Sequence, residues 1–143
     1  MNVKEILDGK GRDVITLGPD ETLADAVRIL AEHGIGALVV TRGGGRIAGI
    51  LSERDIVRAV ASQGAEALQA PIASVMTAKV KVCQETSTVH EVMEIMTRGR
   101  FRHLPVEKNG MLDGIVSIGD VVKRRIEEVE REAEEIRSYI ATA

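Results

Sequence analysis

Two short segments of the chain each pair a serine with an aspartate three residues later. They are residues 49–57, GILSERDIV, and residues 114–122, GIVSIGDVV, so that Ser52 and Asp55 recur as Ser117 and Asp120. A serine and an acid at this spacing form a capping box on the first turn of a helix. The same groups could instead bind a nucleotide. A hydroxyl beside helix N–H groups binds phosphate, and a carboxylate accepts hydrogen bonds from both hydroxyls of a ribose. These residue types leave both uses open.

The two segments belong to a longer internal repeat. Two sets of apolar residues, 66 positions apart, share the i, i+3, i+4, i+7 spacing of an amphipathic helix: Leu23, Ala26, Val27 and Leu30, then Val89, Val92, Met93 and Met96. Thr22 and Thr88 are the expected N-caps, with Asp25 and Glu91 completing each capping box. We expect both helices to end in a left-handed glycine, at Gly34 and at Gly99.

Each repeat also predicts three short strands. They are Val14–Leu17, Ala37–Val40 and Ile47–Leu51, then Val80–Cys83, Leu104–Val106 and Leu112–Val116. The turns at residues 42–46 and 108–110 predict hairpins. Each unit is therefore strand, helix, strand, strand, helix, with one crossover connection and one antiparallel pair. Because 143 residues make about one domain, we expect the two units to pack together with a cleft along their junction.

The C-terminal segment carries a separate pattern. Six apolar residues follow a four-three spacing that is typical of a heptad seam: Val122, Ile126, Val129, Ala133, Ile136 and Ile140. Such a helix could fold back on its own module, pack on a second protomer, or bind a client protein. The sequence leaves these three alternatives open.

Composition excludes several classes of function. One Phe, one Tyr and no Trp leave no aromatic platform for single-stranded nucleic acid, and a net charge of −3 gives no overall basic field. His33, His90, His103 and Cys83 match no metal-ligand spacing, and the chain lacks a G-x-S-x-G nucleophile motif. We therefore expect no metal site, no catalytic residues and no nucleic-acid partner.

The same composition bears on the cellular compartment. A single cysteine, no signal-peptide pattern and no apolar run of about 18 residues predict a cytoplasmic protein without a membrane anchor.

The whole pattern resembles a tandem pair of CBS domains, a Bateman module. The resemblance rests on R-F-R-H-L-P-V, the glycine turn and G-I-V-S-x-x-D, set among capped helices that occur twice. It implies an α/β (α+β) fold in which two βαββα units pack with pseudo-two-fold symmetry, plus a long C-terminal helix. The implied domains are residues 1–62 and 72–126, with a linker at 63–71 and a helical extension at 127–143. It also resembles free-standing bacterial CBS-domain proteins, which implies a homodimer shaped as a flat disc.

The resemblance further implies which residues bind a ligand. Asp55 and Asp120 would bind ribose, and Ser52 and Ser117 would bind phosphate. Arg102 and His103 would face the phosphates, whereas the matching residues of the first repeat are Gly36 and Ala37. Arg54 is a further phosphate candidate, and its counterpart is Gly119. The first strand of each unit, with Thr16, Lys81 and Val82, would receive adenine. The two sites should therefore differ.

The ligand implied is an adenine nucleotide: AMP, ADP or ATP, or else NAD(H) or S-adenosylmethionine, with no catalytic cofactor. Its role would be energy or redox sensing, in which the module regulates a partner protein. The alternative is a structural dimerisation module whose Ser-Asp pairs only cap helices and whose Arg102 and His103 are solvated. The sequence does not identify the physiological nucleotide, the number of occupied sites or the partner.

Overall fold

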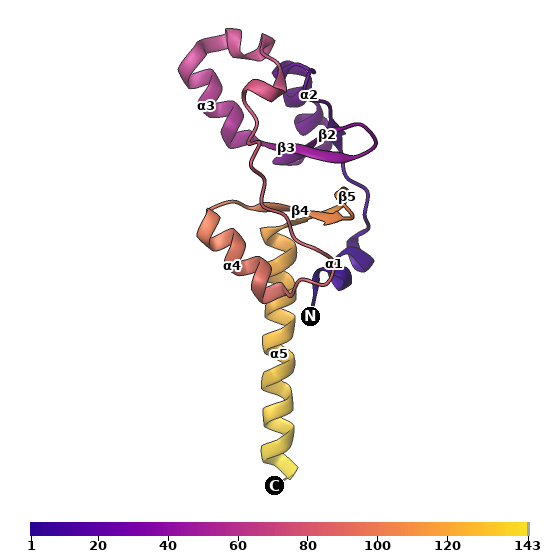
Figure 1. The fold of residues 1–143 in the computed structure, drawn as a ribbon. Coiled ribbons are helices and arrows are strands. Elements are labelled where there is room, and N and C mark those ends of the chain that lie inside the picture. Colours follow the sequence, from indigo (N-terminus) through magenta and orange to yellow (C-terminus); the bar gives the residue numbers. More distant parts are fainter. Residues whose placement is uncertain (143) are drawn as a thin grey trace. The chain divides into compact units, whose positions relative to one another are not determined.

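The computed structural model describes residues 1–142, which form two compact units (Figure 1). The first-repeat unit contains Asp13–Lys81 and the hairpin tip Glu107–Asp113. The second-repeat unit contains Met1–Arg12, Val82–Val106 and the chain from Gly114 onward. Each unit is therefore built from segments that lie far apart in the sequence.

The first-repeat unit contains a small mixed sheet with two helices. Its elements are β1 (Thr16–Leu17), α2 (Leu23–His33), β2 (Ala37–Arg42), β3 (Arg46–Ser52), α3 (Glu53–Gln63) and two 3-10 turns, Gly64–Gln69 and Ile72–Ser74. Strand β1 runs parallel to β2, and β2 runs antiparallel to β3. The predicted crossover and hairpin of the first repeat are thus confirmed. The 3-10 turns were not predicted.

The second-repeat unit has more helix and less sheet. Its elements are α1 (Val3–Lys10), α4 (Val89–Gly99), α5 (Ile118–Thr142) and the larger parts of β4 (His103–Lys108) and β5 (Met111–Ser117), whose hairpin tip belongs to the first-repeat unit. The strand predicted at residues 80–83 is wrong, because only Cys83 forms a single parallel bridge, with Val106. The next donor in that ladder would be the N–H of residue 105, which is a proline. The pairing stops there.

Capping boxes begin four helices. Thr22–Asp25 and Thr88–Glu91 cap α2 and α4 as predicted, and the two Ser-Asp pairs have the same geometry. Gly34 adopts the expected left-handed conformation, with a φ of 61°.

The prediction that α4 ends in a left-handed Gly99 is wrong. Gly99 is still helical, and Arg100 adopts the left-handed φ of 55°. A Cβ on Gly99 would lie 1.9 Å from Cε1 of Phe101, so the glycine makes room for this ring.

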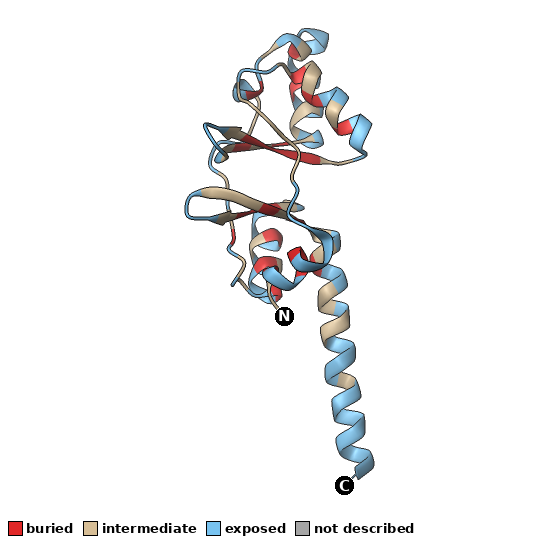
Figure 2. Ribbon diagram, turned by 90° about the vertical axis from the view of Figure 1, so that its right-hand side faces the viewer, coloured by how far each residue is buried: buried red, intermediate tan, exposed pale blue. Residues whose placement is uncertain are grey.

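Each core is completed by the segment that precedes the other repeat (Figure 2). Helix α1 precedes the first repeat, yet Val3, Ile6 and Leu7 are buried in the core of the second. Ile72 follows the first repeat and is fully buried in its core. Sequence reasoning missed α1, although its Asn2 cap and the spacing of its apolar residues were readable.

The glycine of each G-I-[LV]-S segment permits this packing. A Cβ on Gly114 would lie 2.8 Å from Cδ2 of Leu7, and a Cβ on Gly49 would lie 2.8 Å from the carbonyl oxygen of Thr77. Neither glycine has a positive φ. Glycine is therefore needed at these positions because a side chain would not fit, and not because the backbone conformation excludes other residues.

The predicted C-terminal helix is present, but its apolar stripe is exposed. Val121 is buried and Ile118 packs on the core of the second-repeat unit, whereas Ile126, Ile136 and Ile140 are 53%, 61% and 68% exposed. The distal part of α5 is coloured as exposed in Figure 2. No helix within residues 1–142 is long and apolar enough to cross a membrane.

Candidate functional site

The Ser52–Asp55 pair forms a closed capping box where β3 ends and α3 begins. Ser52 Oγ accepts a hydrogen bond of 3.2 Å from the N–H of Asp55, and Asp55 Oδ2 accepts one of 3.0 Å from the N–H of Ser52. The N–H of Glu53 donates to the carbonyl oxygen of Gly36 at 2.9 Å. Ala37 lies directly opposite Ser52 in the β2–β3 register. The helix start therefore lies against the beginning of β2.

The Ser117–Asp120 pair repeats this geometry where β5 meets α5. The two reciprocal hydrogen bonds measure 3.2 and 2.9 Å. The N–H of Ile118 donates to the carbonyl oxygen of Arg102 at 2.8 Å, as Glu53 does to Gly36. Arg102 has an exposed side chain and His103, the first residue of β4, is partly buried. In the second-repeat unit, the backbone of Arg102 therefore lies against the start of α5, and the role of its side chain stays a prediction.

Lys10 distinguishes the second pair from the first. Its ammonium Nζ lies 2.7 Å from Asp120 Oδ2 and donates to the carbonyl oxygen of Ile115 at 3.1 Å. Burial alone would raise the pKa of Asp120. The hydrogen bonds from Lys10 and from the N–H of Ser117, together with the positive charge of Lys10, outweigh burial and lower that pKa. One carboxylate oxygen of this pair therefore already binds a cation.

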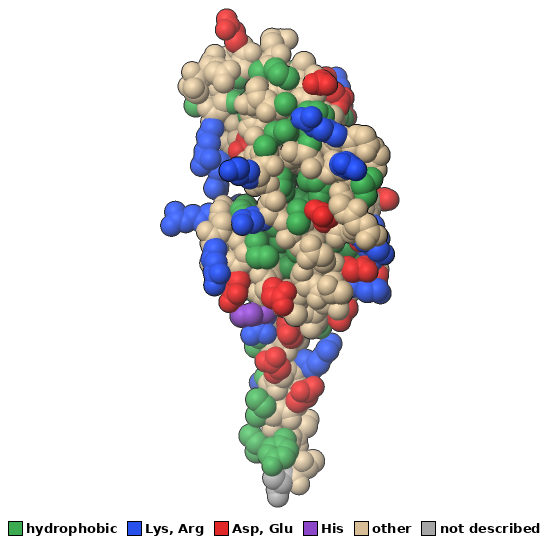
Figure 3. Space-filling model, viewed as in Figure 1, with side chains coloured by type: hydrophobic (Ala, Val, Ile, Leu, Met, Phe, Trp, Pro, Cys, Tyr) green, Lys and Arg blue, Asp and Glu red, His purple; other side chains and the backbone are tan. Residues whose placement is uncertain are grey.

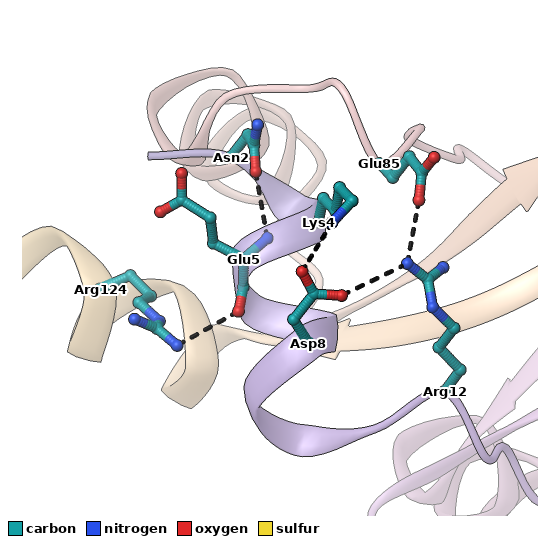
Figure 4. Close-up of polar contacts among 7 residues, drawn as sticks. All are labelled: Asn2, Lys4, Glu5, Asp8, Arg12, Glu85 and Arg124. Carbon is teal, nitrogen blue, oxygen red and sulfur yellow. Dashed lines mark hydrogen bonds and ion pairs between the residues drawn. The ribbon is translucent and has the colours of Figure 1, made fainter.

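Helix α1 is held in place by polar contacts at both ends (Figure 4). Asn2 caps its first turn. Arg12 lies 3.0 Å from Glu85 and 3.8 Å from Asp8, and Arg124 donates to the carbonyl oxygen of Glu5 at 3.3 Å. These contacts fix the helix that carries Lys10. Sequence reasoning missed Lys10, because its contact with Asp120 spans 110 positions and no local pattern reports it.

Asp55 has no such cation. Among residues 1–142, its carboxylate forms no ion pair, and its only hydrogen bond joins Oδ2 to the N–H of Ser52. Arg54 is exposed on the first turn of α3. Oδ1 of Asp55 and the guanidinium of Arg54 therefore remain available to a ligand at this helix start.

The residues implied for adenine binding are placed on β1 and on the irregular segment before Cys83. Thr16 is half-buried in β1 opposite Val39, two positions along β2 from Ala37. Lys81 is exposed and Val82 half-buried in the irregular segment before Cys83. Within the described chain, no hydrogen bond or ion pair joins Thr16, Lys81 or Val82 to a Ser-Asp pair.

Two observations concern the His, Cys and acidic side chains. No group of three His, Cys, Asp or Glu residues in the described part of the chain could hold a metal ion. Burial raises the pKa of Cys83 to about 12, so that its thiol stays protonated at neutral pH.

Comparison with known proteins gives one family and several solved structures. The model of the CBS domain matches residues 3–62 and again residues 72–127. The CBS-domain-containing protein ATU1752 from Agrobacterium tumefaciens is 56% identical, with a TM-score of 0.84 over 87% of this chain and 99% of that one.

Two other similar structures contain ligands. The CBS domain protein PAE2072 from Pyrobaculum aerophilum, complexed with AMP, is 32% identical, with a TM-score of 0.75 over 84% of this chain and 89% of that one. The CBS domain pair of protein MJ0100, in complex with 5-methylthioadenosine and S-adenosyl-L-methionine, is 26% identical. Its TM-score is 0.79 over 90% of this chain and 98% of that one.

Proposed function

Because this chain belongs to the CBS-domain family and contains a tandem pair of these domains, we propose that it is a regulatory module that binds an adenosine-containing ligand. The observation that carries the proposal is the Ser-Asp helix start, built twice with the same hydrogen bonds and the same contact to the residue that precedes a strand. Relatives of this fold were solved with AMP, and with 5-methylthioadenosine and S-adenosyl-L-methionine. These ligands share an adenosyl group with a ribose.

The chemistry of each helix start fits the ribose and what is attached to it. Oδ1 of Asp55 can accept from ribose hydroxyls while Oδ2 keeps the bond to Ser52. Arg54 offers a cation to phosphate in the first repeat, and Arg102 with His103 does so in the second. The two sites should therefore prefer different ligands, as the sequence predicts.

A bound ligand can regulate a partner only if it prefers one conformation of the module over another. The ligand would act by stabilising the arrangement that the partner recognises, in response to nucleotide energy or redox state. No catalytic cofactor enters this proposal. Recovery of the bound ligand unchanged after long incubation supports a sensor, whereas turnover would indicate an enzyme.

A second candidate function is a structural dimerisation module without a physiological ligand. One observation favours it: the same capping box begins α2 and α4, where no ligand is proposed. Capping alone therefore explains the geometry of all four boxes. Only binding measurements separate the two functions.

The test is isothermal calorimetry of the protein with AMP, ADP, ATP, NAD(H), 5-methylthioadenosine and S-adenosylmethionine. Asp55→Ala and Asp120→Ala should each weaken binding at one site by roughly 10- to 100-fold, because charge-assisted hydrogen bonds are worth about 1.5–3 kcal/mol. Asp25→Ala is the matched control, since it breaks an equivalent box on α2. Binding by none of these compounds, or equal weakening in all three variants, would favour the structural module.

The phosphate role of Arg102 needs its own comparison. Arg102→Ala should weaken binding of AMP more than that of adenosine, because only AMP carries a phosphate for the guanidinium. Equal losses for both ligands would remove Arg102 from the proposed phosphate site. Its side chain is exposed, so the substitution should leave the stability of the unit unchanged.

A further inference from the structure

The distal part of α5 extends beyond the core of its unit. Ile118 and Val121 pack on that core, but from Val129 to Thr142 every residue is exposed except the half-buried Ala133. Figure 3 shows hydrophobic side chains gathered near the free end of this helix. A helical segment of about 12–15 residues is marginal in water without tertiary contacts. This segment therefore requires a partner.

The exposed stripe has the spacing of a coiled-coil seam. In heptad notation, Ile126, Ala133 and Ile140 occupy positions a, while Val122, Val129 and Ile136 occupy positions d. Five of these six are aliphatic side chains that are at least 40% exposed. The stripe is continuous over residues 122–140 and carries no charge.

The residues beside the seam are charged in a complementary way. Positions e hold Lys123, Glu130 and Arg137, and positions g hold Arg125, Glu132 and Tyr139. In a parallel pair in register, each g residue faces the e residue of the next heptad on the other helix. Arg125 would then face Glu130, and Glu132 would face Arg137. By symmetry each attractive contact occurs twice.

The antiparallel arrangement gives the opposite result. When two such helices overlap fully in antiparallel orientation, e faces e and g faces g. Lys123 would face Arg137, while Glu130 and Glu132 would each face their own copy. All of these contacts are repulsive. Shifting the helices by one heptad removes the repulsion only by leaving apolar residues at one end of the stripe unpaired.

We propose that residues 122–140 of α5 form a two-stranded parallel coiled coil, in register, with the same segment of a second copy of this chain. The excess of acidic residues in α5 does not cause repulsion across the seam. The remaining acidic residues lie at positions b and c, away from it: Glu127, Glu128, Glu134 and Glu135. Glu127 and Glu128 are also paired within their own helix, with Arg124 and Arg125. The proposal does not depend on ligand binding.

A charge exchange on the full chain tests the pairing. Glu132→Arg and Arg137→Glu should each weaken self-association about five- to tenfold, because two attractive contacts become repulsive in each dimer. The double variant should restore the wild-type dissociation constant. Sedimentation equilibrium measures both the constant and the number of chains. An assembly of three chains, or single variants without effect, would overturn the proposal.

A cysteine reporter tests orientation and separates α5 from any other contact surface. Ile136→Cys should form a disulfide between chains under mild oxidation, because equivalent d positions meet in a parallel pair. Glu134→Cys, at an outward b position, is the matched control and should not. The native Cys83 is buried and unreactive, so it can stay. Absence of the disulfide at position 136, with α5 still helical by circular dichroism, would overturn the parallel arrangement.

Two matched variants, two residues apart, test whether the apolar side chains of the seam hold the two helices together. Ile136→Asp places a carboxylate in the seam, and Ser138→Asp places the same group at an outward f position. Only Ile136→Asp should abolish the disulfide that a second reporter, Val129→Cys, forms at its own d position. Equal effects from both variants would show that added charge, rather than the seam, controls association.

Discussion

At the Ser117–Asp120 helix start, the ammonium of Lys10 neutralises the carboxylate that the proposed ribose would use. Nζ lies 2.7 Å from Oδ2 and makes a second bond to Ile115, so Lys10 competes for the charge of the carboxylate and not for its Oδ1. Asp55 faces no competitor of this kind within the described residues. The carboxylate of Asp120 is therefore a weaker hydrogen-bond acceptor for a ligand than the carboxylate of Asp55, which has no cation beside it among the described residues.

Removing that competitor should tighten binding at the second site. In an Asp55→Ala background, Lys10→Met is expected to lower the dissociation constant of AMP severalfold, because the carboxylate of Asp120 no longer shares its charge with an ion pair worth up to about 1 kcal/mol. Calorimetry measures the change. Lys108→Met, at an exposed hairpin position, is the control and should have no effect. Weaker binding in Lys10→Met would make Lys10 a ligand contact instead.

The same ion pair predicts a pH dependence of stability. The folded-state pKa of Asp120 is lowered, so its contribution is fully present above the unfolded pKa of about 3.9 and is lost as pH falls through the folded value. Urea unfolding should therefore show wild type more stable than Lys10→Met by up to about 1 kcal/mol at pH 6–8. That difference should shrink as pH falls below the unfolded pKa and Asp120 takes up a proton in the folded state. A difference that does not shrink on acidification would indicate lost packing rather than lost charge pairing.

At the scale of the element, the glycine of each G-I-[LV]-S segment allows a neighbouring segment to lie against a strand. Gly114→Ala should destabilise the protein by about 1–3 kcal/mol, because the new methyl overlaps Leu7 of α1. Thermal unfolding measures the loss. Gly119→Ala, five residues later in α5, is the control, since its Cβ meets Ser117 only at 3.6 Å. Equal melting temperatures for Gly114→Ala and wild type would contradict the packing account.

Sequence patterns predicted the elements whose signals are local. The capping boxes of α2 and α4, the hairpin turns and the length of α5 follow from spacings of a few residues. The failures have non-local causes. The strand before Cys83 is stopped by Pro105 on its partner, and Gly99 is needed by the ring of Phe101 rather than by the backbone.

The candidate site likewise combines features with local sequence signals and features that depend on non-local contacts. The capping boxes of the two Ser-Asp pairs follow from local spacing, so the sequence predicted their geometry, while their role in ligand binding stays a prediction. Lys10 could not be found, because it reaches Asp120 only after α1 has crossed to the other repeat. The roles of Thr16, Lys81 and Val82 stay predictions.

At the scale of the molecule, the two cores should respond separately to a cavity. Leu7→Ala and Ile72→Ala each remove a fully buried aliphatic side chain, which costs about 2–5 kcal/mol. Hydrogen exchange of the native protein should show lost protection in β4, β5 and α4 for Leu7→Ala. Ile72→Ala should lower protection in β2, β3 and α2. Equal, uniform losses in both variants would mean that the chain unfolds as one cooperative block.

The segment that precedes each repeat packs in the core of the other repeat, and this arrangement has a consequence for folding during synthesis. Helix α1 is translated before both repeats, yet its partners Glu85, Ser87, Asp120 and Arg124 follow some 80 to 120 residues later. At a translation rate of about 5–20 residues per second, the apolar face of α1 stays exposed for several seconds before the core that covers it is synthesised. The first-repeat unit can begin to form earlier, from Ile72 and the segments before it. During synthesis, α1 is thus the described segment with most need of a chaperone.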